Sequence, residues 1–73
     1  MTREEAREKL KEFYQCCIEK IGGDRTAALR LDKTNPIITH SEMYEAVLED
    51  KYIEGYGNPL DRYITLKNIK ITE

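Results

Sequence analysis

The sequence predicts a small α+β domain in which three helices precede a two- or three-stranded β segment. Two observations point to helices: Thr-x-x-Glu capping boxes begin two segments, and apolar residues follow at helical spacing. A third points to strands, because the last third of the chain is rich in Tyr, Ile and Thr between turn residues. The 73 residues, taken as one domain over 1–73, lie near the lower size limit for a single hydrophobic core.

Composition narrows the class of protein. Hydrophobic residues make up 40% and charged residues 36%, which is typical of a folded globular domain rather than a disordered chain. The start Met-Thr-Arg-Glu-Glu lacks the apolar segment of a secretion signal, and no apolar run reaches the roughly 20 residues that span a bilayer. We therefore expect a cytoplasmic protein without a membrane partner. The net charge of −2 does not favour nucleic acid as the partner.

The first helix is expected over residues 3–21. Thr2 and Glu5 form its capping box, and Gly22-Gly23 ends it because glycine accepts the left-handed cap conformation. Its apolar stripe consists of Leu10, Phe13, Tyr14, Cys17, Ile18 and Ile21. The adjacent Cys16 and Cys17 diverge on a helix and cannot form a disulfide there, so we expect two reduced thiols.

A second, shorter helix is favoured over residues 24–32. Asp24 is a good N-cap, and Ala27, Ala28 and Leu31 would share one face. The alternative is a strand, because Leu29 and Leu31 alternate with polar neighbours. Residues 33–36 read as a turn that ends in Pro36.

The third helix is expected to begin after Thr39 and to end near residues 50–51. Thr39 and Glu42 form the second capping box, and Ile38 can pack on Met43 as a hydrophobic staple. Met43, Ala46 and Val47 would form its buried face. The opposite face carries Glu42, Glu45 and Glu49.

The residues after the third helix, from 52 onwards, predict a β wing. Residues 52–54 read as its first strand, and Gly55, Gly57, Asn58 and Pro59 as a loop. Residues 63–66 and 69–71 are either two strands around a tight turn or one long strand with a bulge. The expected core joins the stripe of the first helix to Ala28, Leu31, Met43, Val47, Ile53, Ile64, Leu66, Ile69 and Ile71.

The order of helices and wing resembles winged helix-turn-helix domains, and residues 38–72 look like the small YjcQ-type winged-helix proteins of Gram-positive bacteria and phages. The residues that carry the resemblance are Thr39, Tyr44, Ala46, Val47, Tyr52, Ile53, Gly55, Ile71 and Thr72. Lys51 departs from the pattern, since many relatives have glycine there. The resemblance implies a winged helix and, as one possibility, a DNA-binding transcriptional regulator.

Charge weighs against that possibility, because the exposed stripe of the third helix is acidic and would repel phosphates. A DNA surface would have to use the second helix, the start of the third helix and the wing. Its candidate residues are Arg25, Arg30, Lys33, His40, Ser41, Arg62, Lys67 and Lys70.

A non-catalytic, regulatory protein-interaction module is the favoured function, because an acidic helix suits a basic partner surface. The candidate contact residues are Glu42, Glu45, Glu49, Tyr44 and Tyr56. We expect no catalysis, since His40 is the only histidine and Ser41 points away from it. No cofactor, metal or small-molecule ligand is evident in the sequence, and neither the target nor the oligomeric state follows from it.

Overall fold

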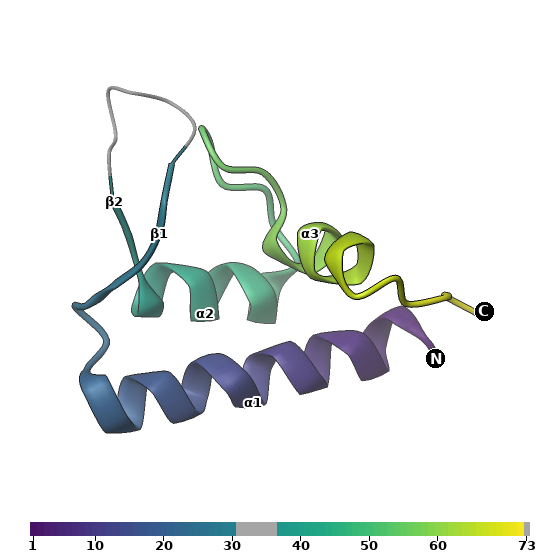
Figure 1. Cartoon of the computed structure of the whole chain (residues 1–73), viewed down its shortest axis with the longest axis horizontal. Coiled ribbons are helices and arrows are strands. Elements are labelled where there is room, and N and C mark those ends of the chain that lie inside the picture. Colours follow the sequence, from purple (N-terminus) through teal and green to yellow (C-terminus); the bar gives the residue numbers. More distant parts are fainter. Residues whose placement is uncertain (31–36, 73) are drawn as a thin grey trace.

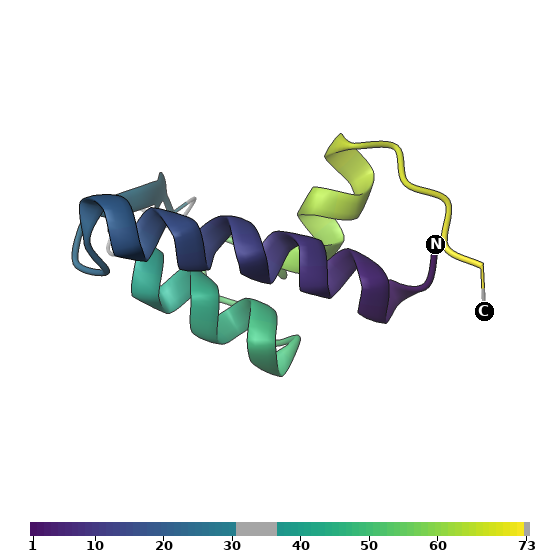
Figure 2. The same ribbon diagram turned by 90° about the horizontal axis from the view of Figure 1, so that it is seen from below.

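A computed structural model describes residues 1–30 and 37–72 of the chain. The elements are α1 (Arg3–Ile21), β1 (Thr26–Leu29), β2 (Ile37–Thr39), α2 (His40–Glu49) and α3 (Pro59–Leu66). Helix α1 runs along one side of the molecule, and the β1–β2 hairpin projects from the end where α1 stops (Figure 1). Viewed from below, α1 lies in front with α2 on one side of it and α3 on the other (Figure 2).

The first and third predicted helices are confirmed as α1 and α2. The α1 capping box is complete: Glu5 N donates to Thr2 Oγ1 at 3.1 Å, and Thr2 N donates to Glu5 Oε1 at 2.9 Å. At the start of α2 only half of the predicted box forms, because Glu42 N donates to Thr39 Oγ1 while the Glu42 carboxylate pairs with Arg30. The Thr2 and Thr39 hydroxyls thus accept hydrogen bonds from backbone amides that have no partner within their helices.

The predicted helix over residues 24–32 is wrong, and the strand alternative is correct for Thr26–Leu29. Strand β1 pairs antiparallel with β2 in the register Thr26 with Thr39, Ala28 with Ile38 and Leu29 with Ile37. Long-range backbone bonds decide the conformation: His40 N donates to Arg25 O at 2.9 Å, and Ser41 N to Gly23 O at 3.0 Å. Leu31 and the 33–36 turn fall outside the described residues.

The predicted wing is also corrected, because residues 63–66 belong to α3 rather than to a strand. Asn58 caps this helix through its side chain, which accepts from Leu60 N at 2.9 Å, and Pro59 occupies the first turn. Residues 69–72 form no strand; Thr72 N instead donates to Met1 O at 2.9 Å, which places the two ends side by side (Figure 1). Of the first wing strand only an isolated bridge between Ile53 and Gly57 is present.

In the described part of the chain, the core consists of two clusters that meet at Tyr14. One contains Ala6, Leu10, Val47 and Leu60; the other contains Ile38, Met43, Ala46 and Ile53. Half-buried Tyr14 packs against both clusters and so joins α1 to α2 and to the chain around Ile53. The expected core positions Met43, Val47 and Ile53 are confirmed.

Several expected core residues lie on the surface instead. The exposed fractions are 59% for Phe13, 54% for Ile21, 77% for Leu66 and 38% for Ile71. Leu66 and Ile71 are exposed because the strands that were to bury them do not form. The coarse class is therefore confirmed as a small α+β fold with three helices and a two-stranded antiparallel sheet, and the winged-helix arrangement is not confirmed.

Candidate functional site

A groove with a volume of about 400 Å³ lies between α1, α3 and the turn that precedes α3. We call it the aromatic groove because four of its ten lining residues are aromatic. This volume falls within the range of about 300–1,000 Å³ that is typical of ligand sites. Its lining includes Phe13, Tyr14, Tyr56, Tyr63, Leu66 and three cationic side chains.

Three side chains of the groove carry positive charge. Lys9 comes from α1, Arg62 from α3, and Lys67 is the C-cap of α3. None of the groove's lining residues carries a carboxylate. In a chain of net charge −2, this is a local excess of positive charge beside apolar rings. Such a surface attracts an anionic ligand that also presents apolar groups.

The aromatic rings are fixed to different degrees. Tyr14 is half-buried between the two core clusters, and this burial raises the pKa of its hydroxyl to about 12, so the group is neutral at physiological pH. Phe13 meets Tyr14 edge-on, with ring centroids 5.1 Å apart and planes at 78°. Because Phe13 is 59% exposed, it forms an open wall of the groove that a partner can cover.

Arg62 is held against Tyr56. Its guanidinium carbon lies 4.3 Å from the ring centroid of Tyr56, and its Nη1 donates to Tyr56 O at 2.9 Å. A cation over a tyrosine face is attracted by the negative charge of the π face. The side chain is therefore positioned before any ligand arrives.

The groove unites residues that the sequence had assigned to two different surfaces. Arg62 and Lys67 were DNA candidates on the wing, and Tyr56 was a protein-contact candidate. Lys9 and Tyr63 were not identified from the sequence as residues of a site, although both line the groove. The Asn58-Pro59 pair was the overlooked signal, because an N-cap followed by proline predicts a helix that would bring Tyr63 and Lys67 towards α1.

The other cationic candidates are not brought together with the groove. Arg25 is exposed at the base of the hairpin, and Arg30 forms an ion pair with Glu42. Lys70 is exposed near the N-terminus, where its carbonyl accepts from the terminal ammonium of Met1 at 3.4 Å. Lys33 lies outside the described residues.

The start of α2 was a candidate phosphate site, but its first amides already have partners. His40 N donates to Arg25 O, Ser41 N to Gly23 O and Glu42 N to Thr39 Oγ1. His40 was a candidate for DNA contact, but its side chain is only 7% exposed and packs near Tyr14, with ring centroids 6.2 Å apart. Ser41 is exposed.

The acidic stripe of α2 is partly engaged within the chain. Glu42 pairs with Arg30, while Glu45 and Glu49 are exposed, and Glu49 lies 3.2 Å from Lys51 Nζ. Tyr44 is half-buried. The depression that includes Glu42 and Glu45 measures about 220 Å³, is smaller than the aromatic groove and mixes both signs of charge.

Within residues 1–30 and 37–72, no group of three or more His, Cys, Asp or Glu side chains is placed to hold a metal ion. Over the same residues, no helix has the length and apolarity that crossing a membrane requires. Cys16 and Cys17 are both free, with Cys16 exposed and Cys17 half-buried.

Comparisons with protein-family models, with curated proteins and with solved structures give no match to this chain. The chemistry of the aromatic groove is therefore the basis for assigning a function.

Proposed function

We propose that this protein is a non-catalytic binding module that docks an acidic, apolar segment of a partner protein in the aromatic groove. The observation that carries the proposal is the combination of four aromatic side chains, of which Phe13 is mostly exposed, with three cations and no carboxylate among the residues that line one hollow of an otherwise acidic chain. Aromatic side chains and arginine are the residue types that most often dominate binding energy at protein interfaces.

Apolar contact supplies an attraction that does not depend on charge. Phe13 is 59% exposed and Leu66 is 77% exposed, so each has apolar surface to lose on binding. Full burial of such a side chain contributes about 1.5–3 kcal/mol, and an exposed ion pair about 0.2–1 kcal/mol. The apolar side chains of the partner should therefore provide most of the affinity, and its carboxylates the orientation and the rate of association.

The groove suits a protein segment better than duplex DNA. Duplex binding needs several cations spread along a face so that they meet successive phosphates. Here Arg30 is engaged by Glu42, the first amides of α2 are occupied, and the exposed face of α2 carries Glu45 and Glu49. The three cations of the groove instead surround apolar rings.

The test is selection of random 12-residue peptides displayed on phage against the immobilised protein. Leu66→Glu serves as the blocked variant, because a carboxylate on this exposed wall repels an acidic ligand without disturbing the core. Leu48→Glu is the matched control: Leu48 is also exposed, at 41%, but lies on α2 and does not line the groove. Thermal unfolding establishes that both variants are folded.

We expect the selected peptides to combine Asp or Glu with aromatic or aliphatic residues. They should bind the wild type and Leu48→Glu equally and Leu66→Glu at least about ten-fold more weakly. Absence of enrichment over the bare support, selection of basic peptides, or equal binding to Leu66→Glu would overturn the proposal. Groove-dependent binding of a fluorescent DNA duplex at low salt, without peptide binding, would overturn it in favour of a nucleic-acid partner.

A further inference from the structure

We infer that Arg62, held over the ring of Tyr56, binds a carboxylate of the docked segment in a bidentate pair and thereby sets the specificity of the aromatic groove. This inference rests on the proposed function and adds to it the residue that recognises the partner. It also defines the ligand: a segment in which Asp or Glu stands close to an apolar side chain.

Arg62 differs from three other arginines, each of which pairs with a carboxylate of this chain. Arg3 pairs with two carboxylates, Arg7 lies 3.6 Å from Glu4, and Arg30 pairs with Glu42. Within residues 1–30 and 37–72, no carboxylate lies within ion-pair distance of Arg62. Its charge is therefore not neutralised by the described part of the chain.

The guanidinium of Arg62 is nevertheless well anchored. Its Nη1 donates to the carbonyl of Tyr56, and that carbonyl belongs to a tight turn in which Tyr56 N and Gly57 N both donate to Ile53 O, at 3.0 and 2.8 Å. Ile53 is a core residue with 8% exposure. The position of the guanidinium is thus tied to the core through three hydrogen bonds, which lowers the entropy lost when a ligand binds.

A guanidinium has five N–H donors in a planar fork, and the contact with Tyr56 O uses one nitrogen. The other donors match the two oxygens of a carboxylate in a bidentate pair. Lys9 and Lys67 are exposed and end in ammonium groups, which act as point charges without a preferred direction. Arg62 therefore provides recognition, while the two lysines attract the ligand at longer range.

Apolar side chains lie beside Arg62, whose bidentate pairing with a ligand carboxylate we call the clamp. Tyr63 and Leu66 follow Arg62 on α3 and line the groove with Phe13 of α1. A ligand whose carboxylate lies on Arg62 consequently places its neighbouring side chains against these walls. An isolated acidic residue without an apolar neighbour would gain only the ion pair and should bind much more weakly.

The experiment measures the affinity of a selected acidic peptide by fluorescence anisotropy for four variants. Arg62→Lys keeps the charge and removes the fork, and Tyr56→Leu removes the aromatic support; we expect each to weaken binding at least about ten-fold. Tyr56→Phe keeps the ring and should change affinity less than about three-fold. Lys67→Gln should also cost less than about three-fold at physiological salt but reduce the salt dependence of the association rate.

Equal affinity of Arg62→Lys and wild type would overturn the clamp while leaving docking in the groove intact. Failure of the proposed function would be recognised differently, because no acidic peptide whose binding depends on the groove would be selected. In that case 3-phenylpropionate is the probe, with 3-phenylpropanamide as its neutral counterpart, and the Nε–H signal of Arg62 is followed by NMR. A saturable shift with the carboxylate alone upholds the clamp and overturns docking of a protein segment; no shift overturns the clamp.

Discussion

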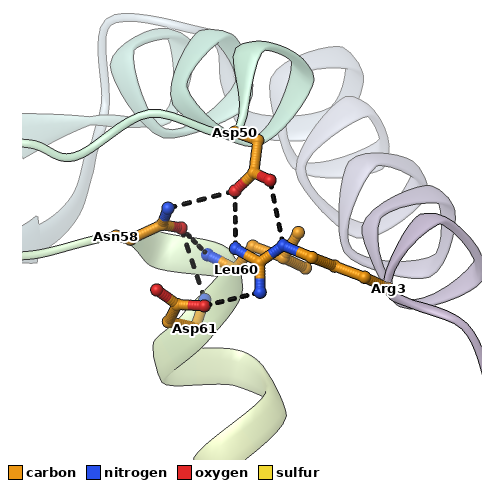
Figure 3. Close-up of polar contacts among 5 residues, drawn as sticks. All are labelled: Arg3, Asp50, Asn58, Leu60 and Asp61. Atoms are coloured by element: carbon orange, nitrogen blue, oxygen red, sulfur yellow. Dashed lines mark hydrogen bonds and ion pairs between the residues drawn. The ribbon is translucent and has the colours of Figure 1, made fainter. Parts of the chain in front are cut away.

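Asp50 provides the sharpest test of how the three helices are held together, because one polar cluster joins their ends (Figure 3). Arg3 of α1 donates from Nε and Nη2 to the two carboxylate oxygens of Asp50, at 2.9 and 2.7 Å, and from Nη1 to Asp61 of α3 at 2.6 Å. Asn58 Nδ2 donates to Asp50 Oδ1 at 3.0 Å. Asp50 is also the C-cap of α2, with a left-handed backbone at φ 51°.

We predict that Asp50→Asn destabilises the fold at neutral pH by about 1 kcal/mol. The hydrogen bonds from Arg3 and Asn58 lower the pKa of Asp50 from its ordinary value of 3.8 to about 2. A difference of one in pKa corresponds to about 1.4 kcal/mol, so the lowering of the Asp50 pKa from 3.8 to about 2 gives an upper limit of about 2 kcal/mol for the stabilisation. Since the Arg3 and Asp50 side chains are 32% and 31% exposed, solvent screening reduces this value by about half.

The sign of the pH dependence follows from the lowered pKa. The carboxylate stabilises the fold above its unfolded pKa, and this contribution is lost as the pH falls through the folded value. The gap in unfolding free energy between wild type and Asp50→Asn should therefore be full at pH 7 and should shrink steadily between about pH 4.5 and pH 2. Asparagine tolerates the left-handed backbone, so the substitution leaves the α2 cap acceptable.

Urea unfolding at several pH values measures this gap. Glu49→Gln is the matched control, because it removes one negative charge next to Asp50 in sequence from an exposed pair with Lys51. We expect that control to change stability by less than about 0.5 kcal/mol. The reasoning is refuted if Asp50→Asn matches Glu49→Gln at pH 7, or if its gap persists unchanged at pH 2.

Further predictions concern the backbone and the core. Gly22 has φ 103° and ψ 147°, a conformation that side chains disfavour, so Gly22→Ala should lower the unfolding free energy by about 1–3 kcal/mol. Gly23→Ala is its control: the added carbon meets Ser41 Oγ, which can rotate away, and the melting temperature should hardly change. Val47→Asp should abolish the cooperative thermal transition, because Val47 is 0% exposed and an unpaired charge there is costly; a native-like transition would contradict the facing of α2. Leu60→Ala should cost about 2–5 kcal/mol in urea unfolding, since Leu60 is fully buried between α1 and α2; a loss below 1 kcal/mol would contradict the place of α3 in the core.

Local sequence patterns were sufficient for α1 and α2. The Thr2 and Thr39 caps, the helical spacing of apolar residues and the Gly22-Gly23 stop act within a few residues, so their effects can be read in order along the chain. The hairpin could not be read in this way. Residues 26–29 suit a helix or a strand about equally, and their choice depends on bonds to the start of α2.

Helix α3 was mispredicted for a different reason. Tyr63-Ile64-Thr65 has the β-branched and aromatic character of a strand, and intrinsic preference alone favours that reading. The decisive residue is Leu60, which is fully buried and places Tyr63 and Ile64 on the same helical face by i, i+3 and i+4 spacing. The candidate groove depends on α3, so a prediction that makes residues 63–66 a strand divides the residues of the groove between a wing and a protein-contact surface.

The groove itself follows from the way α3 meets α1. Helix α3 runs across α1 rather than along it (Figure 2), and it has only 8 residues against the 19 of α1. It therefore covers only part of one side of α1, and Phe13 and Leu66 remain exposed. The chain thus buries enough apolar surface to fold while leaving aromatic surface next to three cations. Phe13→Ala removes part of this aromatic surface and should weaken partner binding. The melting temperature should hardly change, because the Phe13 side chain is mostly exposed and contributes little to the stability of the fold.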